Sequence, residues 1–207
     1  EIVNDVSFAI EDRDKIALIG VNGTGKTTLL RMLAGLETYE EGSITKKSGL
    51  RVSYLPQDPV FDEDDTILHQ ILSMDKEIQE FEAKSILGKL GISDSSLNIS
   101  HLSGGQRKRV ALARALLKPC DLLILDEWGY VPVDKDGSQL LFRVISDSYE
   151  SKSLILTTNL EFSKWGGIFT DDQMAAAMID RLVHHGHLLI FEGKSYRMEH
   201  ALMRQDA

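Results

Sequence analysis

The nine residues GVNGTGKTT, from Gly20 to Thr28, constrain the fold more than any other part of the sequence. They fit the pattern G-x-x-x-x-G-K-[ST] and lie between an apolar run, Ile16–Ile19, and a helical pattern, Thr27–Ala34, that ends at Gly35. Glycines let successive backbone N–H groups turn inward around an anion, and the start of the helix adds partial positive charge. The pattern therefore predicts a strand, a loop and a helix that together cradle the phosphates of a nucleotide. A glycine-rich turn without a ligand is the alternative.

Lys26 and Thr27 have the most specific expected roles in this loop. The Lys26 ammonium is expected to reach the β- and γ-phosphates of ATP, and the Thr27 hydroxyl is expected to bind Mg²⁺. The residues that we expect to contact the nucleotide here are Gly20, Asn22, Gly23, Gly25, Lys26, Thr27 and Thr28.

Composition limits the classes of protein to which the chain can belong. A chain of 207 residues with 43% hydrophobic residues can build one substantial core. The net charge of −9 argues weakly against a protein that is held on nucleic acid by phosphate contacts alone. The single cysteine, Cys120, excludes a disulfide framework and suits a reducing, cytoplasmic location, so we expect it to be a buried apolar residue. No apolar run approaches the roughly 20 residues of a membrane span, so none is expected.

Strand and helix patterns alternate along the chain. This alternation predicts an α/β fold, a three-layer P-loop NTPase sandwich with a mostly parallel sheet. Apolar alternation at Val6–Ile10, together with a strand pair at residues 42–47 and 51–57, predicts an antiparallel portion near the N-terminus. A helical insertion is expected at about residues 60–118. The predicted elements are strands at Val6–Ile10, Ile16–Ile19, 42–47, 51–57, Leu122–Leu125 and Leu154–Leu156, helices at Thr27–Ala34, Gly105–Lys118, 140–149 and Ala175–Val183, a mostly helical stretch from Thr66 to Leu90, and a hairpin of 188–191 with 196–198.

A second motif, HLSGGQRKRVALARALL, opens one of these helices. Ser103 and Gln106 form a capping-box pattern, and Gly104 and Gly105 leave the first amides of the helix uncovered. We therefore expect Ser103, Gly104, Gly105 and Gln106 to form a second anion-binding helix start. An ordinary capped helix would also explain Ser103 and Gln106.

Residues 1–127 resemble the ATP-binding cassette (ABC) family. The matching motifs are Walker A at Gly20–Thr28, the Q-loop at Gln57 in YLPQD, the signature at Leu102–Gln106 and Walker B at Leu122–Glu127. The resemblance implies that Asp126 helps to hold Mg²⁺, that Glu127 polarises the attacking water, and that Gln57 senses the metal and the γ-phosphate. It also implies that the signature caps the nucleotide of a second ATPase domain or subunit. GLRVSYLPQD and RKRVALARALL are most similar to the ABC-F proteins, which implies the ribosome as a partner.

The sequence departs from the ABC pattern after Glu127. Trp128 and Gly129 replace the expected Pro-Thr, and the next strand ends in ILTTN at Asn159 rather than in a histidine. Residues 126–207 resemble instead the C-terminal half of the IstB-like transposition helper ATPases of the AAA+ class. That resemblance implies that Asn159 is a polar sensor, that Arg181 is an arginine finger, and that DNA and a transposase are partners. A helix or turn cap is the alternative for Asn159, and a surface salt bridge is the alternative for Arg181.

Asp126 and Glu127 stand where the two resemblances meet. Both families place this acidic pair at the end of one strand and insert the following strand between the Walker A and Walker B strands. We therefore expect an ABC-type portion, residues 1–127, and an IstB-like portion, residues 128–207, to complete one sheet. Binding of MgATP should persist, but hydrolysis should be slow, because the two ancestries need different partners. The predicted functions are an ABC-F-like soluble ATPase, an IstB-like ATP-dependent transposition helper, or a nucleotide-binding hybrid without a coupled activity.

Overall fold

The computed structural model describes residues 6–127, 146, 152–159, 165–166, 172–183 and 186–191. Within these ranges, five strands form one sheet in the order β2-β3-β4-β1-β5, and every strand pair is parallel. The elements are β1 (Lys15–Gly20), α1 (Lys26–Ala34), β2 (Val52–Leu55), α2 (Ile67–Leu72), α3 (Glu80–Lys89), a short 3₁₀ turn (Ile99–His101), α4 (Gly104–Leu117), β3 (Leu122–Leu125), β4 (Ser153–Thr158), α7 (Asp172–Val183) and β5 (Gly186–Phe191). This arrangement confirms the predicted α/β class with a mostly parallel sheet.

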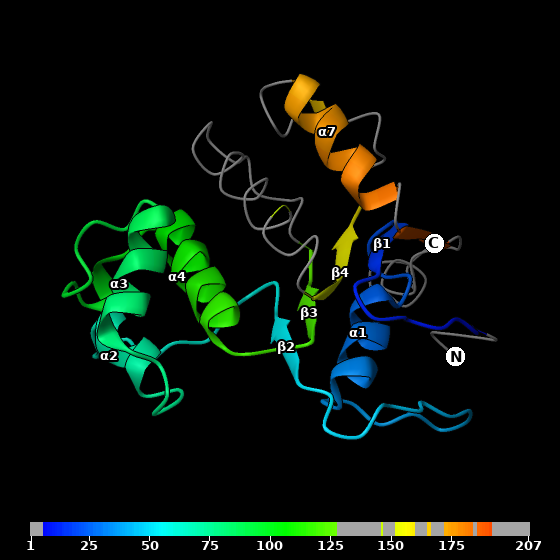
Figure 1. The fold of residues 1–207 in the computed structure, drawn as a ribbon, viewed down its shortest axis with the longest axis horizontal. Helices are drawn as coiled ribbons and strands as arrows, with labels where there is room; N and C mark the ends of the chain where they lie inside the picture. The colour runs from blue at the N-terminus through cyan, green and yellow to red at the C-terminus, as the bar shows by residue number, and fades with distance from the viewer. Residues whose placement is uncertain are drawn as a thin grey trace, which may run out of the picture.

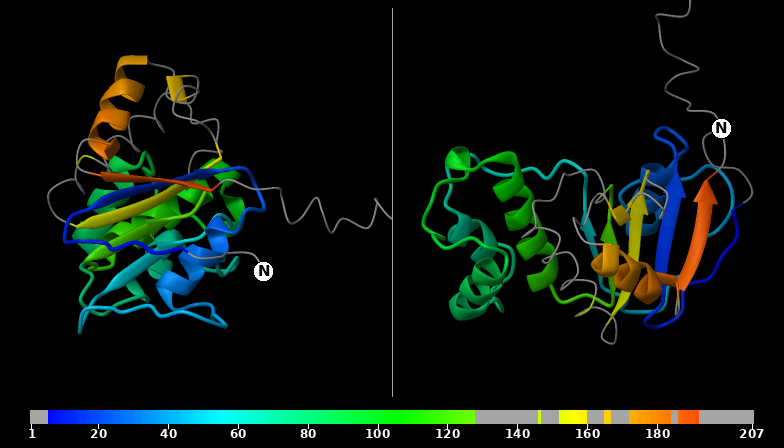
Figure 2. Two further views of the ribbon diagram at one scale, coloured as in Figure 1. Left: turned by 90° about the vertical axis from the view of Figure 1, so that its right-hand side faces the viewer. Right: turned by 90° about the horizontal axis from the view of Figure 1, so that it is seen from above.

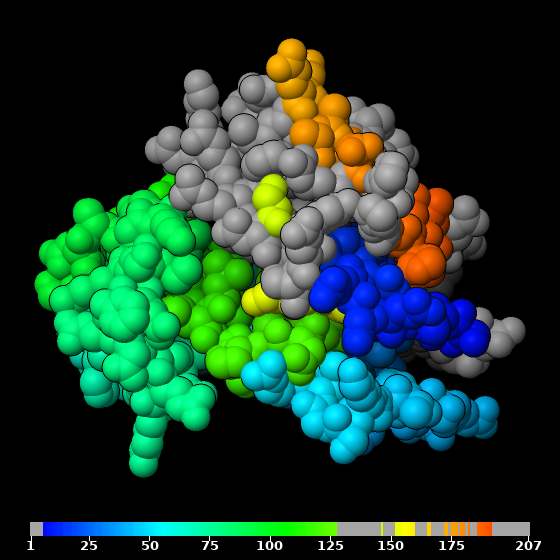
Figure 3. Space-filling model, viewed as in Figure 1, coloured from blue at the N-terminus to red at the C-terminus, as the bar shows by residue number. Residues whose placement is uncertain are grey.

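Helices cover both faces of the sheet and one of its edges. Helix α1 lies on one face and α7 on the opposite face (Figures 1 and 2). Helices α2, α3 and α4 gather beyond the β2 edge of the sheet, where the space-filling view shows them as one solid lobe (Figure 3). The molecule thus has three layers. Because the strands are all parallel, their carboxyl ends lie along one edge of the sheet.

The alternation of side chains along each strand separates two cores. Ile16 and Leu18 of β1 pack with Leu30 of α1, whereas Ala17 between them joins the core on the other face. That second core continues from the sheet into the helical lobe and includes Leu112 of α4 and Leu182 of α7. Cys120 is buried, as predicted, and burial raises the pKa of its thiol.

Strand β4 lies between the strand that precedes the phosphate loop and the strand that ends in Asp126. It pairs with β1, with Leu18 opposite Thr157, and with β3, with Leu125 opposite Leu156. This confirms the predicted insertion of the strand after Asp126 and Glu127 between the other two. Because parallel strands point the same way, the residues after β1, β3 and β4 all emerge side by side.

The predicted antiparallel portion near the N-terminus is wrong for the residues that the structure describes. Residues 6–10 and 42–47 are not strands there. Phe8 and Ile10 pack against the core on the α1 face while Ser7 and Ala9 are exposed, so the alternation reflects one-sided burial without strand pairing. Residues 42–47 are almost all exposed and bury no apolar face that would hold a strand in place.

The stretch from Thr66 to Leu90, predicted to be mostly helical, contains the two helices α2 and α3. A turn at Asp75 separates them, because the Asp75 carboxylate accepts a hydrogen bond from Glu77 N and its carbonyl accepts one from Ile78 N. The predicted C-terminal hairpin is described only in part: β5 pairs with β1, and residues 196–198 lie outside the described residues. The helix predicted at 140–149 also lies outside them, except for residue 146. No helix among the described residues is both long and apolar enough to cross a membrane.

Candidate functional site

The loop between β1 and α1 depends on glycines at three positions. Two of them have left-handed backbones, and the third lies where β1 closely approaches the end of β5. Gly23 and Gly25 have φ angles of 86° and 93°, a conformation that side chains with a Cβ rarely adopt. The Thr24 hydroxyl donates to the Val21 carbonyl at 2.9 Å and closes the turn. At Gly20 a Cβ would lie 2.6 Å from the carbonyl oxygen of Phe191, so only glycine fits where β1 adjoins the end of β5. The predicted phosphate loop therefore has a local structure that its glycines make possible.

The Lys26 side chain is folded across this loop. Its Nζ donates to the Gly20 carbonyl at 2.6 Å and to the Val21 carbonyl at 2.8 Å, and the residue is only 3% exposed. The ammonium is thus held at the start of α1, where the backbone amides of the first turn have no intrahelical acceptors. This is a site of concentrated positive charge suited to a phosphate group.

Asp126 is the centre of a buried hydrogen-bond network at the end of β3. The residue is 1% exposed, and its Oδ1 accepts from Thr157 Oγ1 at 2.8 Å and from Thr27 Oγ1 at 3.2 Å. Its Oδ2 accepts from the Tyr54 hydroxyl at 3.0 Å. Four elements therefore meet at one carboxylate, which is a buried acid with a donor for each oxygen.

Sequence reasoning missed Tyr54 and Thr157, which supply two of these donors. Burial and the neighbouring Asp126 carboxylate raise the pKa of Tyr54 well above its ordinary value, so its hydroxyl stays protonated and able to donate. Thr157 is fully buried in β4. The signal in the sequence was the pair of threonines, Thr157 and Thr158, that follows the apolar run Leu154–Leu156, but the residue they contact depends on which strands lie side by side.

Glu127, Asn159 and Gln57 lie at the same edge of the sheet. Glu127 has a left-handed φ of 50°, and its backbone N–H donates to Thr157 Oγ1 at 2.6 Å. Asn159 is half-buried directly after β4, one residue beyond the point where Thr158 pairs with Ile19. Gln57 is exposed, two residues after β2 ends at Leu55, whose carbonyl accepts from Asp126 N at 3.0 Å. The fold thus places these three predicted residues at the carboxyl edge of the sheet, the edge from which the phosphate loop also leaves.

The signature segment forms a helix start in the lobe rather than part of this cluster. Ser103 Oγ accepts from Gln106 N at 3.3 Å, and Gln106 Oε1 accepts from Ser103 N at 2.9 Å, which is the predicted capping box. Gly104 and Gly105 are exposed, with nothing near an added Cβ. Among the described residues, no hydrogen bond joins this segment to the phosphate loop. Arg181 belongs to α7, but its side chain lies outside the described residues.

Two families match overlapping parts of the chain. The family described as ABC transporter matches residues 3–129, and the family described as IstB-like ATP binding protein matches residues 95–204. The ABC transporter ATP-binding protein YfmR of Bacillus subtilis is 38% identical over 61% of this chain. An ATP-binding protein of insertion sequence IS232 from Bacillus thuringiensis subsp. berliner is 44% identical over 38% of it.

The fold is also similar to that of a solved ABC protein. The crystal structure of an archaeal ribosome recycling factor, aABCE1, in complex with the archaeal ribosomal stalk protein aP1 matches 87% of this chain, with a TM-score of 0.65 and 30% identity. The chain spans 27% of the length of YfmR, 31% of the IS232 protein and 32% of the recycling factor chain.

Proposed function

The chain belongs to the ABC transporter family over residues 3–129 and to the family of IstB-like ATP binding proteins over residues 95–204, and from this we propose that it binds MgATP and acts as an ABC-type ATPase. The observation that carries the proposal is the contact between Asp126 and Thr27, which joins the acid at the end of β3 to the start of α1. The phosphates would lie in the loop from Gly20 to Thr28, against the Lys26 ammonium.

The oxygen atoms of Thr27 and Asp126 suit a magnesium ion. Mg²⁺ prefers oxygen ligands at about 2.0–2.1 Å in octahedral geometry, so two neighbouring ligands lie about 2.9 Å apart. The 3.2 Å between Thr27 Oγ1 and Asp126 Oδ1 is close to this separation. When bound, the ion would neutralise phosphate charge, while Tyr54 and Thr157 hold the carboxylate in place. Gln57, which follows β2 at the same edge, is the further residue that we assign to the metal and the γ-phosphate.

We assign the hydrolytic role to Glu127 and a sensing role to Asn159. The backbone of Glu127 is anchored by Thr157, which also holds Asp126, so the two acids keep a defined relation to each other. A carboxylate at this position would accept a proton from the attacking water. Asn159 follows the neighbouring strand and would hydrogen-bond that water or the γ-phosphate.

We expect the proposed hydrolysis to be slow because the two candidate trans-acting segments of the chain need different arrangements of a partner. Ser103 to Gln106 form an exposed helix start in the lobe, which suits the nucleotide of a second ATPase domain or subunit. Arg181 would instead reach the nucleotide of a neighbour in a different, AAA+-like arrangement. A trans-acting positive group contributes about 10³–10⁵-fold in related phosphoryl transfers, so a chain without one should turn over slowly.

The experiment for this function is steady-state ATP hydrolysis by the parent chain and by Glu127→Gln. We expect a low rate that falls by roughly 10²–10⁴-fold in the variant, because the substitution removes the base but keeps the shape of the side chain. Nucleotide affinity should change little, since the loop from Gly20 to Thr28 is untouched. Equal rates in the two proteins would remove Glu127 from this role.

Each of the two families suggests a different partner for the chain. The resemblance to ABC-F proteins supports a ribosome-bound ATPase, and co-sedimentation with ribosomes in the presence of ATP is the expected result. The match of residues 95–204 to the IstB-like family supports, as a second function, an ATP-dependent helper of DNA transposition. That function predicts duplex DNA binding that weakens steeply as salt is raised. ATP binding without either interaction would identify a nucleotide-binding hybrid that has no coupled activity.

A further inference from the structure

A second concave site lies at the opposite edge of the sheet from the phosphate loop. A cavity of about 310 Å³ opens where four segments enter the sheet: residues 12–13 before β1, residues 47–50 before β2, Asp121 before β3, and residues 152–153 at the start of β4. Parallel strands begin at a common edge, and this brings segments that are distant in sequence together. The volume is at the small end of the range found for pockets that bind small molecules.

The charge of this cavity is positive on balance. Arg13, Lys47 and Lys152 line it, together with the acids Asp12 and Asp121. Asp121 is already neutralised by Arg51, which donates from its backbone N at 2.9 Å, from Nε at 3.2 Å and from Nη2 at 2.9 Å. These contacts lower the pKa of Asp121 to about 2, so its negative charge is compensated within the protein.

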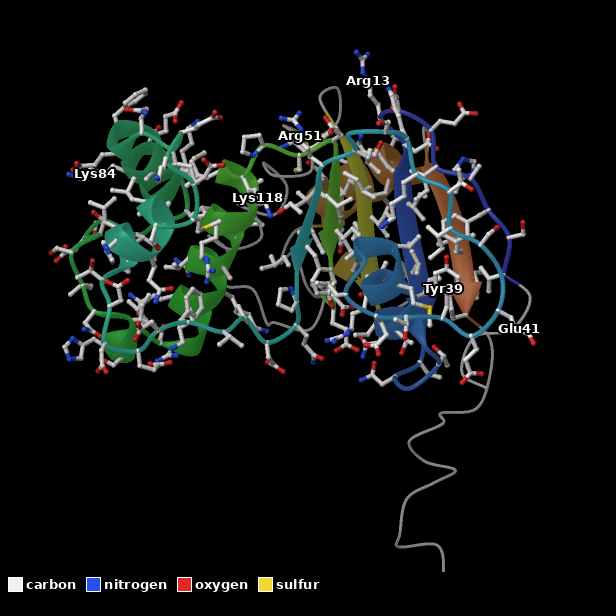
Figure 4. All side chains as sticks on the ribbon, turned by 90° about the horizontal axis from the view of Figure 1, so that it is seen from below. Arg13, Tyr39, Glu41, Arg51, Lys84 and Lys118 are labelled. Carbon is white, nitrogen blue, oxygen red and sulfur yellow. The ribbon has the colours of Figure 1, made fainter. Side chains whose placement is uncertain are left out.

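Arg13 and Lys152 are the two cations of the cavity that form no ion pair with an acid in the described part of the chain. Lys47 lies 3.5 Å from Asp12, but both side chains are largely exposed, so this pair is weak. No ion pair joins Arg13 or Lys152 to any of the residues that the structure describes. Figure 4 shows Arg13 projecting from the same edge of the molecule as Arg51.

The backbone of Arg13 is held in an unfavourable conformation beside the cavity. Its φ of 74° is left-handed, which is uncommon and unfavourable for a residue other than glycine. The strain is sustained by two contacts: Arg13 N donates to Ser153 Oγ at 2.9 Å, and the Arg13 carbonyl accepts from Lys15 Nζ at 2.8 Å. Strained residues of this kind often mark sites where a ligand is positioned.

A buried lysine connects the two cationic segments. Lys15 is fully buried, and its Nζ donates to the Lys152 carbonyl at 2.9 Å as well as to that of Arg13. The same amine therefore holds the backbones on both sides of the cavity. Arg13 and Lys152 are thus cations on a fixed frame rather than two independent surface side chains.

We propose that this cavity binds a small phosphorylated anion between Arg13 and Lys152, at a site separate from the phosphate loop. An arginine fork matches the geometry of phosphate oxygens, and a lysine adds a point charge from a second direction. Lys47 on the third side would complete the neutralisation of a doubly charged phosphate monoester. The site is distinct from the proposed nucleotide site because Arg13 lies before β1, whereas Gly20 is the last residue of that six-residue strand.

The test is calorimetric titration of the Lys26→Ala chain with inorganic phosphate, with ³¹P line broadening as a second readout. Lys26→Ala should weaken phosphate binding by the loop from Gly20 to Thr28 and should leave the cavity around Arg13 and Lys152 unchanged. Arg13→Gly removes the guanidinium and also relieves the left-handed backbone, so the variant should fold at least as stably as its parent. Lys152→Ala removes the other cation, and Lys84→Ala, which changes an exposed lysine of α3 at the far end of the helical lobe, is the matched control (Figure 4).

The expected result is that Lys26→Ala still binds phosphate and that adding Arg13→Gly or Lys152→Ala weakens this binding by about tenfold. Adding Lys84→Ala should leave it unchanged. The proposal is overturned if Lys26→Ala abolishes all phosphate binding, or if Arg13→Gly and Lys152→Ala behave like the control. ATP binding by chains with Lys26 intact reports on the nucleotide site, so failure of the two proposals can be told apart.

Discussion

Replacing Thr157 by valine tests whether the two parts of the chain share one site. The Thr157 hydroxyl donates to Asp126 Oδ1 at 2.8 Å and accepts from Glu127 N at 2.6 Å, and the residue is fully buried. Valine has nearly the same shape but can make neither contact. A hydrogen bond to a charged group contributes about 1.5–3 kcal/mol, and a buried N–H without an acceptor costs about 1–3 kcal/mol. Since the two effects overlap at one hydroxyl, we expect Thr157→Val to lower the free energy of unfolding by about 2–4 kcal/mol.

Urea denaturation followed by circular dichroism measures this loss. For a slope of about 2 kcal/mol per molar urea, the midpoint should fall by roughly 1–2 M. Thr157→Ser keeps the hydroxyl and removes only a methyl group, so it should cost about 1 kcal/mol. The reasoning is refuted if Thr157→Val is as stable as the parent chain, or if the serine variant is equally damaged.

Three further predictions concern single residues. The pKa of Tyr54 is raised in the folded chain, so the unfolded chain loses the phenol proton first, and the free energy of unfolding should fall as pH rises above about 10.0. Tyr54→Phe should flatten this part of the stability profile, which urea titrations at about pH 9 to 11 would measure. Arg51 lowers the pKa of Asp121 to about 2, so the contribution of the ionised Asp121 to stability should be present above pH 3.8 and be lost as pH falls toward 2. Arg51→Met should remove that part of the acid transition in a series of thermal melts at decreasing pH. Glu127→Gln should slow ATP hydrolysis without weakening ATP binding, and a matching loss of affinity would show that Glu127 supports the nucleotide instead.

The parts of the fold that could be predicted from sequence are those that depend on local geometry or on connectivity. The loop from Gly20 to Thr28 was recognisable because glycines are required at its left-handed positions. The position of β4 could be predicted because the acidic pair at 126–127 ends one strand in both related families, and the strand after it enters the same gap. Helix α4 was marked at its start by the capping box of Ser103 and Gln106 and at its end by Pro119.

The parts that could not be predicted depend on which strands become neighbours. Tyr54 and Thr157 contact Asp126 only because β2 and β4 flank β3. The spacing of residues along the chain does not predict that contact. Val6–Ile10 was misread as a strand because alternating burial of Phe8 and Ile10 is also achieved by an unpaired segment. The roles proposed for Ser103 and Arg181 would depend on a second subunit, which a single chain does not specify.

The account rests on a triphosphate held between the phosphate loop and the Asp126 network. The most direct test is the affinity of the chain for a fluorescent ATP analogue, with and without Mg²⁺, compared with Lys26→Ala and with the exposed-lysine control Lys84→Ala. We predict Mg²⁺-dependent binding that Lys84→Ala preserves and Lys26→Ala weakens by about 10- to 100-fold, since a charge-assisted contact to phosphate contributes about 1.5–3 kcal/mol. Equal binding by the parent chain and Lys26→Ala, or no binding by the parent chain with Mg²⁺ present, would contradict the account.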